Sequence, residues 1–399
     1  MRRRVFLAGA GAAATGLAGL AVQPSSAVAA TANPTTPATT GAAARAGWRL
    51  TPAPAAAPAS RLLSVSAASA DLAWAVGEQG LPGQGTGGGP LALCWDGAAW
   101  AHTDVGHLGL NGSLRAVSGT SPDAAWAVGQ DRDGADRLLR WDGSTWRQVR
   151  YPGDDDPATV LTWVTATSDG RAWVTGQHEG RPKLLRFDGT KWVWTPPIPG
   201  ATSPDAPWRV RISPSGGVHT VGWDLARWDE SAAGHGSWTV LPPLTGIRLG
   251  VNDLLPVGED ELWAVGAAFG VGGPPGKPPS VVLAHYDGTE WTRVDGDTLP
   301  FKIGSLNAIA GSGTGTEGTG GGRPGLIGGW DFWDDSSAHY LRWDGTEWAG
   351  ERGAADGVDA YVRDVASIPG TGAQGGAWSV GHTRNVPAAE VRFRIERYG

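Results

Sequence analysis

The chain has 399 residues and a formal net charge of −7, a balance that disfavours nucleic acid and anionic membrane surfaces as partners. Its single cysteine excludes an internal disulfide framework and any metal site built on cysteines. Glycine and proline make up nearly a quarter of the sequence, which is typical of disorder, but 22 tryptophans that recur between turn signals indicate a sheet protein instead.

Residues 1–30 have the pattern of an export signal. Residues 2–4 are arginines, a mild apolar stretch runs from Ala8 to Val22, and Ala27–Ala29 is typical of a cleavage site. Two arginines followed by x-Phe-Leu resemble the twin-arginine signal, which exports folded proteins across the bacterial inner membrane, and an ordinary secretory signal is the alternative. The apolar stretch is too short to stay as a membrane span. We therefore expect a secreted, extracytoplasmic protein whose net charge falls from −7 to −10 when the three arginines are removed.

Residues 31–47 form a linker rich in threonine, alanine and proline, which has no periodicity and is predicted to be disordered. The segment Trp48–Pro52 follows it. This segment resembles the last strand of the repeat unit described next, but no first three strands precede it. We therefore expect it to complete a unit elsewhere in the chain.

The clearest repeat unit is Ser113–Val149. Its four predicted strands are Leu114–Ser118, Ala125–Gly129, Leu138–Trp141 and Trp146–Val149. An Asp-Gly turn of the hairpin type joins the last two strands. One such sheet has two apolar faces and cannot bury both alone, so copies must pack face to face.

The pattern occurs seven times. Each second strand carries Trp-Ala-Val-Gly or a variant of it, and each turn between third and fourth strands carries Trp-Asp-Gly-x-x-Trp or a variant. The second strands end at Gly77, Gly129, Gly176, Gly222, Gly266, Gly329 and Gly381. The fourth copy is degenerate, with His219 in place of tryptophan and a widened turn from Trp228 to Trp238. The seventh copy stops after its third strand, Val391–Tyr398, so its missing fourth strand is the segment that begins at Trp48.

A unit completed by both ends of the chain closes a ring and removes exposed strand edges. Over residues 48–399 we therefore predict an all-β, seven-bladed β-propeller of four-stranded antiparallel blades, closed by the N-terminal strand joining the last blade. An open β-solenoid or two separate sheets are the alternatives. The expected ring would account for the whole chain after the linker.

The repeats Trp-Ala-Val-Gly and Trp-Asp-Gly-x-x-Trp resemble those of bacterial secreted β-propellers, and the resemblance extends from Trp48 to the end. They are distantly similar to kelch repeats. Asp-box repeats are similar too, but their spacing is one residue longer. This resemblance implies no single activity, because propellers serve as lectins, scaffolds, hydrolases and lyases alike.

The loops on one face of the predicted disc vary more than those on the other. Antiparallel order places the second-to-third loops and the blade-to-blade connections on one face, which we call the working face. From the strand-ending glycine to the next aromatic residue, the second-to-third segments span 6 to 20 residues. The third-to-fourth turns keep their two aromatics five apart in five blades. Because uniform turns are typical of scaffold and variable loops of recognition, we expect function on the working face.

Three tryptophans on that face lie outside the repeat positions, and carboxylates accompany two of them. The candidate ligand-binding residues are Trp223, Trp330 and Trp333 with Asp331, Asp334 and the neighbouring Asp335. Flat aromatic faces stack on the C–H groups of sugars, and carboxylates accept hydrogen bonds from sugar hydroxyls. The alternative is that these tryptophans cap gaps between blades, whereas repeat tryptophans such as Trp126 and Trp141 are expected in the core.

Histidines and aspartates give weaker candidates. His107, His178 and His382 fall in working-face loops and are further candidate ligand-binding residues, or else surface residues. His285 stands where other blades carry arginine, so we assign it to the repeat structure. The loop residues Asp131, Asp133 and Asp136 resemble the start of a calcium loop, and an acidic solvated loop is the alternative. No cofactor other than this candidate Ca²⁺ is evident.

The leading hypothesis is a secreted, monomeric, non-catalytic binding protein that presents working-face loops to a glycan, a cell-envelope polymer or a protein. The absence of Gly-x-Ser-x-Gly and His-Glu-x-x-His motifs supports it. One alternative is an extracellular hydrolase or lyase with acids and histidines around the mouth of the central channel, where single-sequence reading identifies no catalytic residue. Another is a protein-interaction scaffold.

Overall fold

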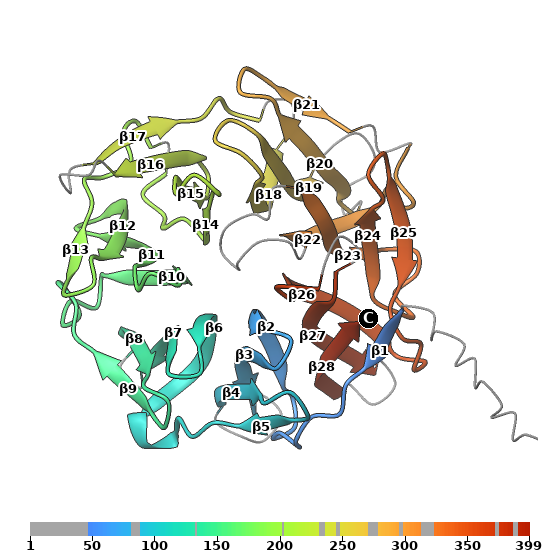
Figure 1. Ribbon diagram of the computed structural model, residues 1–399, viewed down its shortest axis with the longest axis horizontal. Coiled ribbons are helices and arrows are strands. Elements are labelled where there is room, and N and C mark those ends of the chain that lie inside the picture. The colour runs from blue at the N-terminus through green and yellow to red at the C-terminus, as the bar shows by residue number, and fades with distance from the viewer. Residues whose placement is uncertain are drawn as a thin grey trace, which may run out of the picture. The chain divides into compact units, whose positions relative to one another are not determined.

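The computed structural model describes residues 47–80, 88–131, 134–201, 203–230, 236–244, 248–269, 278–294, 298–312, 323–371, 375–385 and 390–399. The predicted export signal and the linker up to residue 46 lie outside the described residues. No helix in the part that is described is long and apolar enough to cross a membrane. The described part of residues 46–399 forms one compact unit, in which seven four-stranded antiparallel sheets are arranged in a ring (Figure 1). This confirms the predicted seven-bladed β-propeller. We call the middle of this ring, which the innermost strands border, the channel.

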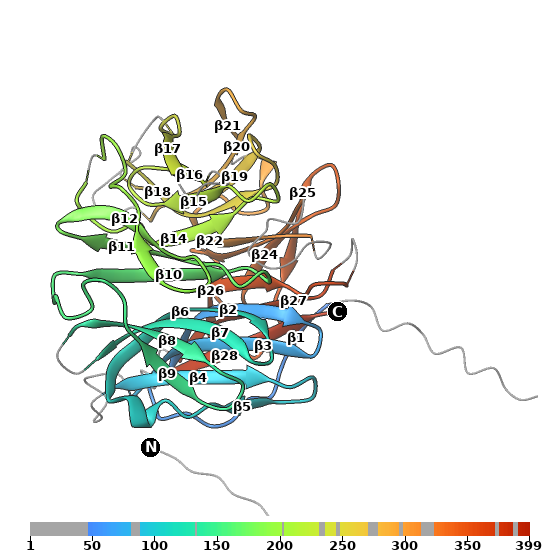
Figure 2. The same ribbon diagram turned by 60° about the vertical axis from the view of Figure 1, so that its left-hand side comes forward.

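Each blade is a meander whose strands run in order from the channel to the rim (Figures 1 and 2). Blades one to three are β2 (Arg61–Ser69), β3 (Leu72–Gln79), β4 (Gly89–Trp95), β5 (Trp100–His102); β6 (Leu110–Ser121), β7 (Ala124–Asp131), β8 (Asp136–Trp141), β9 (Trp146–Val149); and β10 (Val160–Ala166), β11 (Ala172–His178), β12 (Arg181–Phe187), β13 (Trp192–Trp194). A short 3₁₀ turn, η1 (Gly106–Leu108), connects blades one and two.

The remaining blades repeat this order. Blades four to six are β14 (Arg209–Ile212), β15 (Val218–Val221), β16 (Ala226–Glu230), β17 (Gly236–Val240); β18 (Arg248–Pro256), β19 (Leu262–Phe269), β20 (Ser280–Tyr286), β21 (Trp291–Arg293); and β22 (Gly304–Gly311), β23 (Pro324–Asp331), β24 (His339–Trp343), β25 (Trp348–Arg352). Blade seven is β26 (Asp359–Ser367), β27 (Ala377–Asn385), β28 (Glu390–Tyr398) and, outermost, β1 (Trp48–Leu50).

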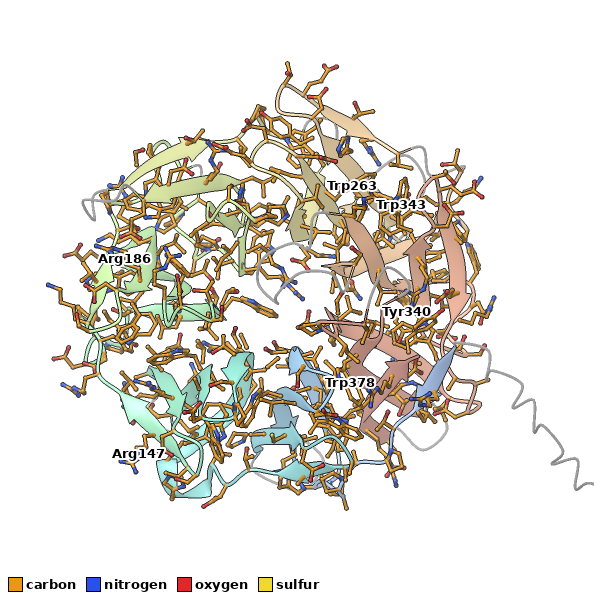
Figure 3. All side chains as sticks on the ribbon, in the orientation of Figure 1. Arg147, Arg186, Trp263, Tyr340, Trp343 and Trp378 are labelled. Atoms are coloured by element: carbon orange, nitrogen blue, oxygen red, sulfur yellow. The ribbon has the colours of Figure 1, made fainter. Side chains whose placement is uncertain are left out.

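The two ends of the propeller meet in blade seven, as predicted. Trp48 of β1 lies opposite Tyr398 of β28, and the backbone N–H of Thr51 donates to the Ile395 carbonyl at 3.1 Å. The Trp48 ring also stacks on Tyr340 of blade six, with centroids 3.8 Å apart (Figure 3 labels Tyr340). The N-terminal strand therefore fastens blade seven to blade six as well as completing its own sheet.

The second-strand tryptophan of one blade inserts between the two aromatic residues of the next blade's Trp-Asp-Gly-x-x-Trp turn. The Trp74 ring lies 5.2 Å from Trp141 and 5.7 Å from Trp146. Equivalent contacts join Trp126 to Phe187 and Trp192, Trp263 to Trp343 and Trp348, and Trp378 to Trp95 and Trp100 (Figure 3). The last of these crosses the seam between blades seven and one. Both halves of the sequence repeat thus serve one inter-blade contact, and Trp126 is buried as predicted.

A side chain on the third strand covers the inserted tryptophan from within its own blade. The Arg140 guanidinium lies 5.3 Å from the centroid of the Trp126 ring. His285 takes the same position over Trp263, with centroids 4.7 Å apart. His285 therefore belongs to the repeat structure, as the sequence indicates.

In six blades the glycine of the second-strand motif faces an irregularity in the first strand, and the second strand continues two to four residues beyond it rather than ending there. In six inner strands the pairing shifts by one residue, a β-bulge, directly after the residue opposite this glycine. A Cβ on Gly266 would lie 1.9 Å from the Gly250 carbonyl oxygen, and one on Gly381 would lie 1.9 Å from the Tyr361 carbonyl oxygen. Only glycine allows the first strand to bulge against the second at this point.

The side chain at the bulge position links neighbouring blades. At five consecutive junctions, from blades two and three to blades six and seven, it donates a hydrogen bond to a backbone carbonyl at the inner edge of the next blade. In blade four, whose described pairs show no register shift, Trp208 just before β14 takes the equivalent place. The pairs are Arg115 to Leu161, Thr162 to Pro207, Trp208 to Val251, Asn252 to Leu306 and Asn307 to Val362. We call this bond the latch. In blade one the residue at this position is Leu63, whose apolar side chain cannot donate a hydrogen bond. In blade seven it is Arg363, which makes no such bond to a described residue.

Blade four departs from the repeat at His219, which occupies the position of the inserted tryptophan. The side chain is fully buried, and neither ring nitrogen has a hydrogen-bond partner among the described residues. Burial, followed by the nearby Arg227 guanidinium, lowers the pKa of His219 to about 3. The imidazole is therefore neutral in the folded protein at neutral pH.

We expect Gly266→Ala to lower the free energy of unfolding by at least about 2 kcal/mol, because the new Cβ would overlap the Gly250 carbonyl. Gly250→Ala in the same hairpin is the matched control, since its Cβ would meet its nearest neighbours at 3.7 Å, and it should change stability by less than about 1 kcal/mol. Urea unfolding monitored by tryptophan fluorescence measures both. Equal stability of the two variants would contradict the role assigned to the glycine.

We expect His219→Leu to make the protein less sensitive to acid. The folded pKa of His219, about 3, lies below its unfolded value. The unfolded state therefore binds the extra proton, and stability falls as the pH drops from about 6.5 toward 3, by up to about 1.4 kcal/mol per pH unit. Leucine at this position cannot bind a proton, so the substitution removes this pH dependence of stability together with the two unpartnered nitrogens. Leucine already occupies the equivalent position in blade six, at Leu326.

Urea unfolding of wild type and His219→Leu between pH 7.5 and 4.5 tests this. The exposed His102, changed to glutamine, is the control. An unchanged slope of unfolding free energy against pH in His219→Leu would show that His219 does not carry the acid sensitivity.

Candidate functional site

Four of the predicted residues come together in blade six, at the end of β23 and in the loop that follows it. They are Trp330, Asp331, Trp333 and Asp334, and Phe332 lies among them. The Trp333 side chain is 76% exposed and that of Phe332 is 40% exposed. Their ring centroids are 5.0 Å apart, and those of Phe332 and Trp330 are 5.8 Å apart. The working face therefore carries an aromatic surface at this loop.

The aromatic surface continues onto blade seven. The Trp330 ring lies 6.0 Å from Tyr361 of β26, and Tyr361 stacks on His382 of the paired strand β27 at 5.1 Å. We call the five rings Trp333, Phe332, Trp330, Tyr361 and His382 the aromatic row. It runs from an exposed outer end at Trp333 to an inner end at His382, which is only 8% exposed.

The aspartates at the outer end shape the loop. Asp334 accepts a hydrogen bond from the Ser336 hydroxyl at 2.7 Å and pairs with Arg352, and these contacts lower its pKa to about 2. Asp331 accepts the backbone N–H of Trp333 at 3.0 Å. Both carboxylates therefore fix the loop that presents Trp333.

Two further acids flank the row. The Asp335 carbonyl accepts the Ala360 N–H at 2.8 Å, which ties the loop to blade seven. Burial and then the neighbouring Asp335 raise the pKa of Asp359, and both carboxylates contribute to a raised pKa of Tyr361. The outer and middle parts of the aromatic row are therefore bordered mainly by carboxylates, although Arg352 pairs with Asp334 and Arg384 lies near Asp359 and Tyr361.

Cations border the inner end. Burial, followed by Arg363 and Arg61, lowers the pKa of His382 to about 3, so its imidazole is neutral. Arg61 of β2 lies 3.9 Å from Glu78 through its Nε atom. The Arg363 side chain reaches solvent, but the blades around it desolvate it, and this together with Arg61 keeps the Arg363 pKa below its usual value. The row thus has opposite charges at its two ends.

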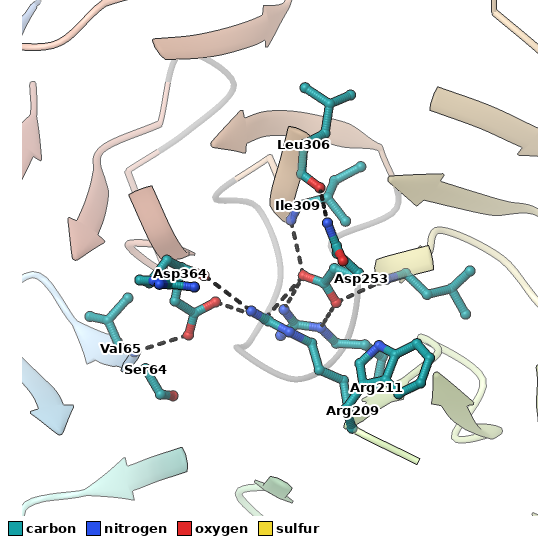
Figure 4. A network of polar contacts seen from close by, with 12 residues as sticks. Ser64, Val65, Arg209, Arg211, Asp253, Leu306, Ile309 and Asp364 are labelled. Atoms are coloured by element: carbon teal, nitrogen blue, oxygen red, sulfur yellow. Dashed lines mark hydrogen bonds and ion pairs between the residues drawn. The ribbon is translucent and has the colours of Figure 1, made fainter. Parts of the chain in front are cut away.

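A buried network of charged residues crosses the channel next to this end (Figure 4). One guanidinium nitrogen of Arg209 lies 2.8 Å from Asp364 and 3.2 Å from Asp253. Arg211 binds Asp253 through two nitrogens, at 2.9 and 2.6 Å. Arg209 lies over the Trp163 ring at 4.1 Å. Arginines of blade four therefore bridge to blades five and seven.

The two carboxylates of this network also accept backbone hydrogen bonds from the next blades. Asp253 accepts the Ile309 N–H and Asp364 accepts the Val65 N–H, both at 3.0 Å (Figure 4). Burial alone would raise the pKa of Asp253, but Arg209 and Arg211 outweigh it and the pKa is lowered. The alternative hypothesis of a hydrolase or lyase predicts carboxylates near the channel. These two are held in ion pairs and hydrogen bonds, which suits a brace between blades better than proton transfer.

The other predicted ligand-binding residues lie elsewhere on the ring. Trp223, 63% exposed, follows β15 in blade four and donates to Asp205 at 3.1 Å. His107 in η1 bonds to the Trp146 carbonyl at 2.9 Å. His178 stacks on Trp194 at 5.0 Å. No ring contact among the described residues joins any of the three to the aromatic row.

The predicted calcium loop is only partly described, because Asp133 lies outside the described residues. Asp131 pairs with Arg137, and Asp136 is buried and pairs with Arg115 at 2.5 Å. Within the described ranges no group of three or more His, Cys, Asp or Glu side chains is placed to hold a metal ion. The calcium site remains a prediction, and these two aspartates already have cationic partners.

Sequence reasoning missed Phe332, Tyr361, Arg363 and Arg61. Phe332 was overlooked although it stands between the candidates Asp331 and Trp333, and Tyr361 was overlooked because it stands in the alternating pattern of an inner strand. Arg363 follows Val362, which faces Gly381 of the second-strand motif, so it stands at the bulge position. An alignment of the seven inner strands at their bulges would have drawn attention to it.

We expect Arg209→Leu to destabilise the propeller by about 3–5 kcal/mol, because it leaves Asp364 buried without its cation. Arg147→Leu is the control (Arg147 is labelled in Figure 3), since this exposed arginine pairs with Asp142 at the surface and should matter little. Thermal and urea unfolding measure both. A loss in Arg209→Leu no larger than that in Arg147→Leu would show that the network does not brace the ring.

Comparison with known proteins agrees on the fold. No family model and no curated protein sequence matches this chain. A solved structure described as "YCF48 bound to D1 peptide" is similar over 88% of this chain and 96% of its own, with 15% identity and a TM-score of 0.55. "Crystal structure of RRP9 WD40 repeats" covers 88% of this chain and 97% of its own, with 10% identity and a TM-score of 0.54.

A third structure, "Structure of U3-55K", is similar over 88% of this chain and 98% of its own, with 9% identity and a TM-score of 0.54. Identities this low are evidence of a common architecture and not of a common activity. The comparisons and the structure therefore lead to the same conclusion, that residues 48–399 form a seven-bladed β-propeller.

Proposed function

We propose that this protein is a secreted, non-catalytic binding protein that holds a glycan on the aromatic row. The observation that carries the proposal is the pair of adjacent exposed rings, Trp333 and Phe332, on a loop fixed by its own aspartates. Exposed aromatic surface costs free energy in water, and its retention on a rigid loop is typical of a recognition site.

The chemistry of the row suits sugar rings. The faces of Trp333 and Phe332 offer apolar surface for the C–H groups of a pyranose. Asp331 and Asp335 beside them are acceptors for hydroxyl hydrogens. The ion pair between Asp334 and Arg352 keeps the loop in place, so little conformational entropy is lost on binding.

A binding role is also supported by the neighbouring folds, and export is supported by the signal-like pattern at residues 1–30. The structure of YCF48 holds a D1 peptide, which makes a protein ligand the second candidate for this chain. A hydrolase or lyase is less well supported, because the channel carboxylates Asp253 and Asp364 are occupied by arginines. We expect the protein to act as a monomer.

We expect Trp333→Ala to weaken glycan binding by about tenfold to a hundredfold, the usual cost of removing a central aromatic contact. Trp223→Ala is the matched control, because Trp223 is an exposed tryptophan on the working face that lies in blade four. It should bind as the wild type does. Trp330→Ala should also weaken binding, through loss of the ring that supports Phe332.

Glycan arrays that include cell-envelope polymers, followed by calorimetry on the best ligand, provide the measurement. Failure of the wild type to bind any glycan, or an equal loss in Trp223→Ala and Trp333→Ala, would refute the proposal.

A further inference from the structure

The charges around the channel balance except at one residue. Arg209 and Arg211 are neutralised by Asp253 and Asp364 in the buried network. Arg61 has Glu78 as its counterion, at 3.9 Å. Arg363 has no hydrogen-bond or ion-pair partner for its guanidinium among the described residues. Glu78 lies close enough to raise the Arg363 pKa, but among the described residues its ion pair is with Arg61, so Arg363 has no ion-pair partner of its own.

Comparison with the latch shows that a side chain such as that of Arg363, unpartnered among the described residues, is unusual at the bulge position. At the five preceding junctions the side chain in this position donates a hydrogen bond to a backbone carbonyl of the next blade. Asn307, for example, donates to the Val362 carbonyl at 2.8 Å. Arg115, the other arginine at this position, is engaged with Asp136 and with the Leu161 carbonyl. Arg363 occupies the same position in blade seven, yet it makes neither contact. Its guanidinium is therefore available to a ligand.

Arg363 also lies at the inner end of the aromatic row. It is two residues beyond Tyr361 on β26, and β27 brings His382 beside it, close enough for its charge to lower the His382 pKa. From the other side, β2 of blade one brings Arg61, since Val65 of that strand bonds to Asp364 next to Arg363. Two guanidinium groups from adjacent blades thus approach the end of the row, near enough for the charge of each to lower the His382 pKa.

An anion that binds here gains twice. It forms the charge-assisted, two-pronged hydrogen bonds that a guanidinium makes to a carboxylate. It also relieves the repulsion between two like charges in a partly desolvated place, where electrostatic interactions are stronger than in bulk water.

We infer that Arg363 and Arg61 form a carboxylate subsite, and that the ligand is an acidic glycan in which a uronic acid is joined to neutral sugars. The uronate binds at the inner end of the aromatic row while neutral rings stack on Phe332 and Trp333. This inference rests on the proposed glycan-binding function. The charge along the row favours such a mixed ligand over an acidic peptide, because Asp331, Asp335 and Asp359 would repel further carboxylates at the outer end.

The first measurement is an array of uronic-acid oligosaccharides, each beside its carboxyl-reduced twin in which the carboxylate has become a hydroxymethyl group. Wild-type binding should be confined to the acidic members and should weaken as salt rises. Equal binding to both twins would overturn the subsite and leave the proposed function standing. No binding to any glycan would overturn both, as would binding confined to acidic peptides.

The second measurement is calorimetry on the best acidic oligosaccharide with Arg363→Asn. Asparagine occupies the bulge position in blades five and six, so the variant should fold and unfold at a temperature no lower than the wild type. We expect at least tenfold weaker binding to the acidic glycan. Arg392→Gln, which removes the same charge from an exposed arginine of β28 paired with Glu390, should bind normally.

Arg61→Gln is the second test of the subsite and should weaken binding in the same direction. Unchanged affinity in Arg363→Asn would overturn the inference even if Trp333→Ala abolishes binding. Loss of affinity in Arg392→Gln equal to that in Arg363→Asn would also overturn it, since the effect would then be one of net charge.

Discussion

The propeller depends on one repeated contact, the insertion of a second-strand tryptophan between the two aromatic residues of the next blade. Because Trp378 makes this contact with Trp95 and Trp100, the seam between the last blade and the first is packed like the junctions within the chain. At the blade six to seven junction the aromatic pair is Tyr398 with Trp48, drawn from opposite ends of the chain, and their rings still meet edge to face at 5.5 Å. The ring therefore closes through the same kind of contact that joins the other blades, and β1 pairs with the edge that β28 would otherwise expose.

The inserted tryptophan is missing from blade four, and there the polar contacts of the channel are densest. His219 replaces it, but the same blade supplies Arg209 and Arg211 to the buried network and Trp208 to the latch. Blade four is thus joined to its neighbours near the channel more than in the middle of the sheet. Such charged contacts depend on geometry more strictly than apolar packing does, because a buried ion that loses its partner is costly. The charged network near the channel and the repeated aromatic contacts farther out therefore both hold the seven sheets in place relative to one another.

The fold could be predicted in full from the sequence, whereas the site could be predicted only in part. Packing imposes a local pattern on every blade, so tryptophan, glycine and the Asp-Gly turn recur at readable spacings. Glycine recurs because the bulge in the first strand lies opposite it and leaves no room for a Cβ atom. Trp330, Asp331, Trp333 and Asp334 were found because they are adjacent in sequence, but Tyr361 and His382 join them only through the ring. Trp223 has the same local signal as Trp333 and lies in another blade, since departure from the repeat marks a residue without giving its position on the ring.

The same reasoning supports the proposed location of recognition, where the repeat is broken. At five of the seven junctions the side chain at the bulge position forms the latch, and the fold supplies its partner. Arg363 stands at such a position but forms no latch with a described residue, so the contacts between blades do not account for its charge. Trp333 and Phe332 are exposed on a loop whose own aspartates hold it, so packing does not account for their surface. Two independent departures at the two ends of one row of contacting rings are more economically explained by one extended ligand than by separate accidents of the surface, because each ring between them lies within 6.0 Å of the next.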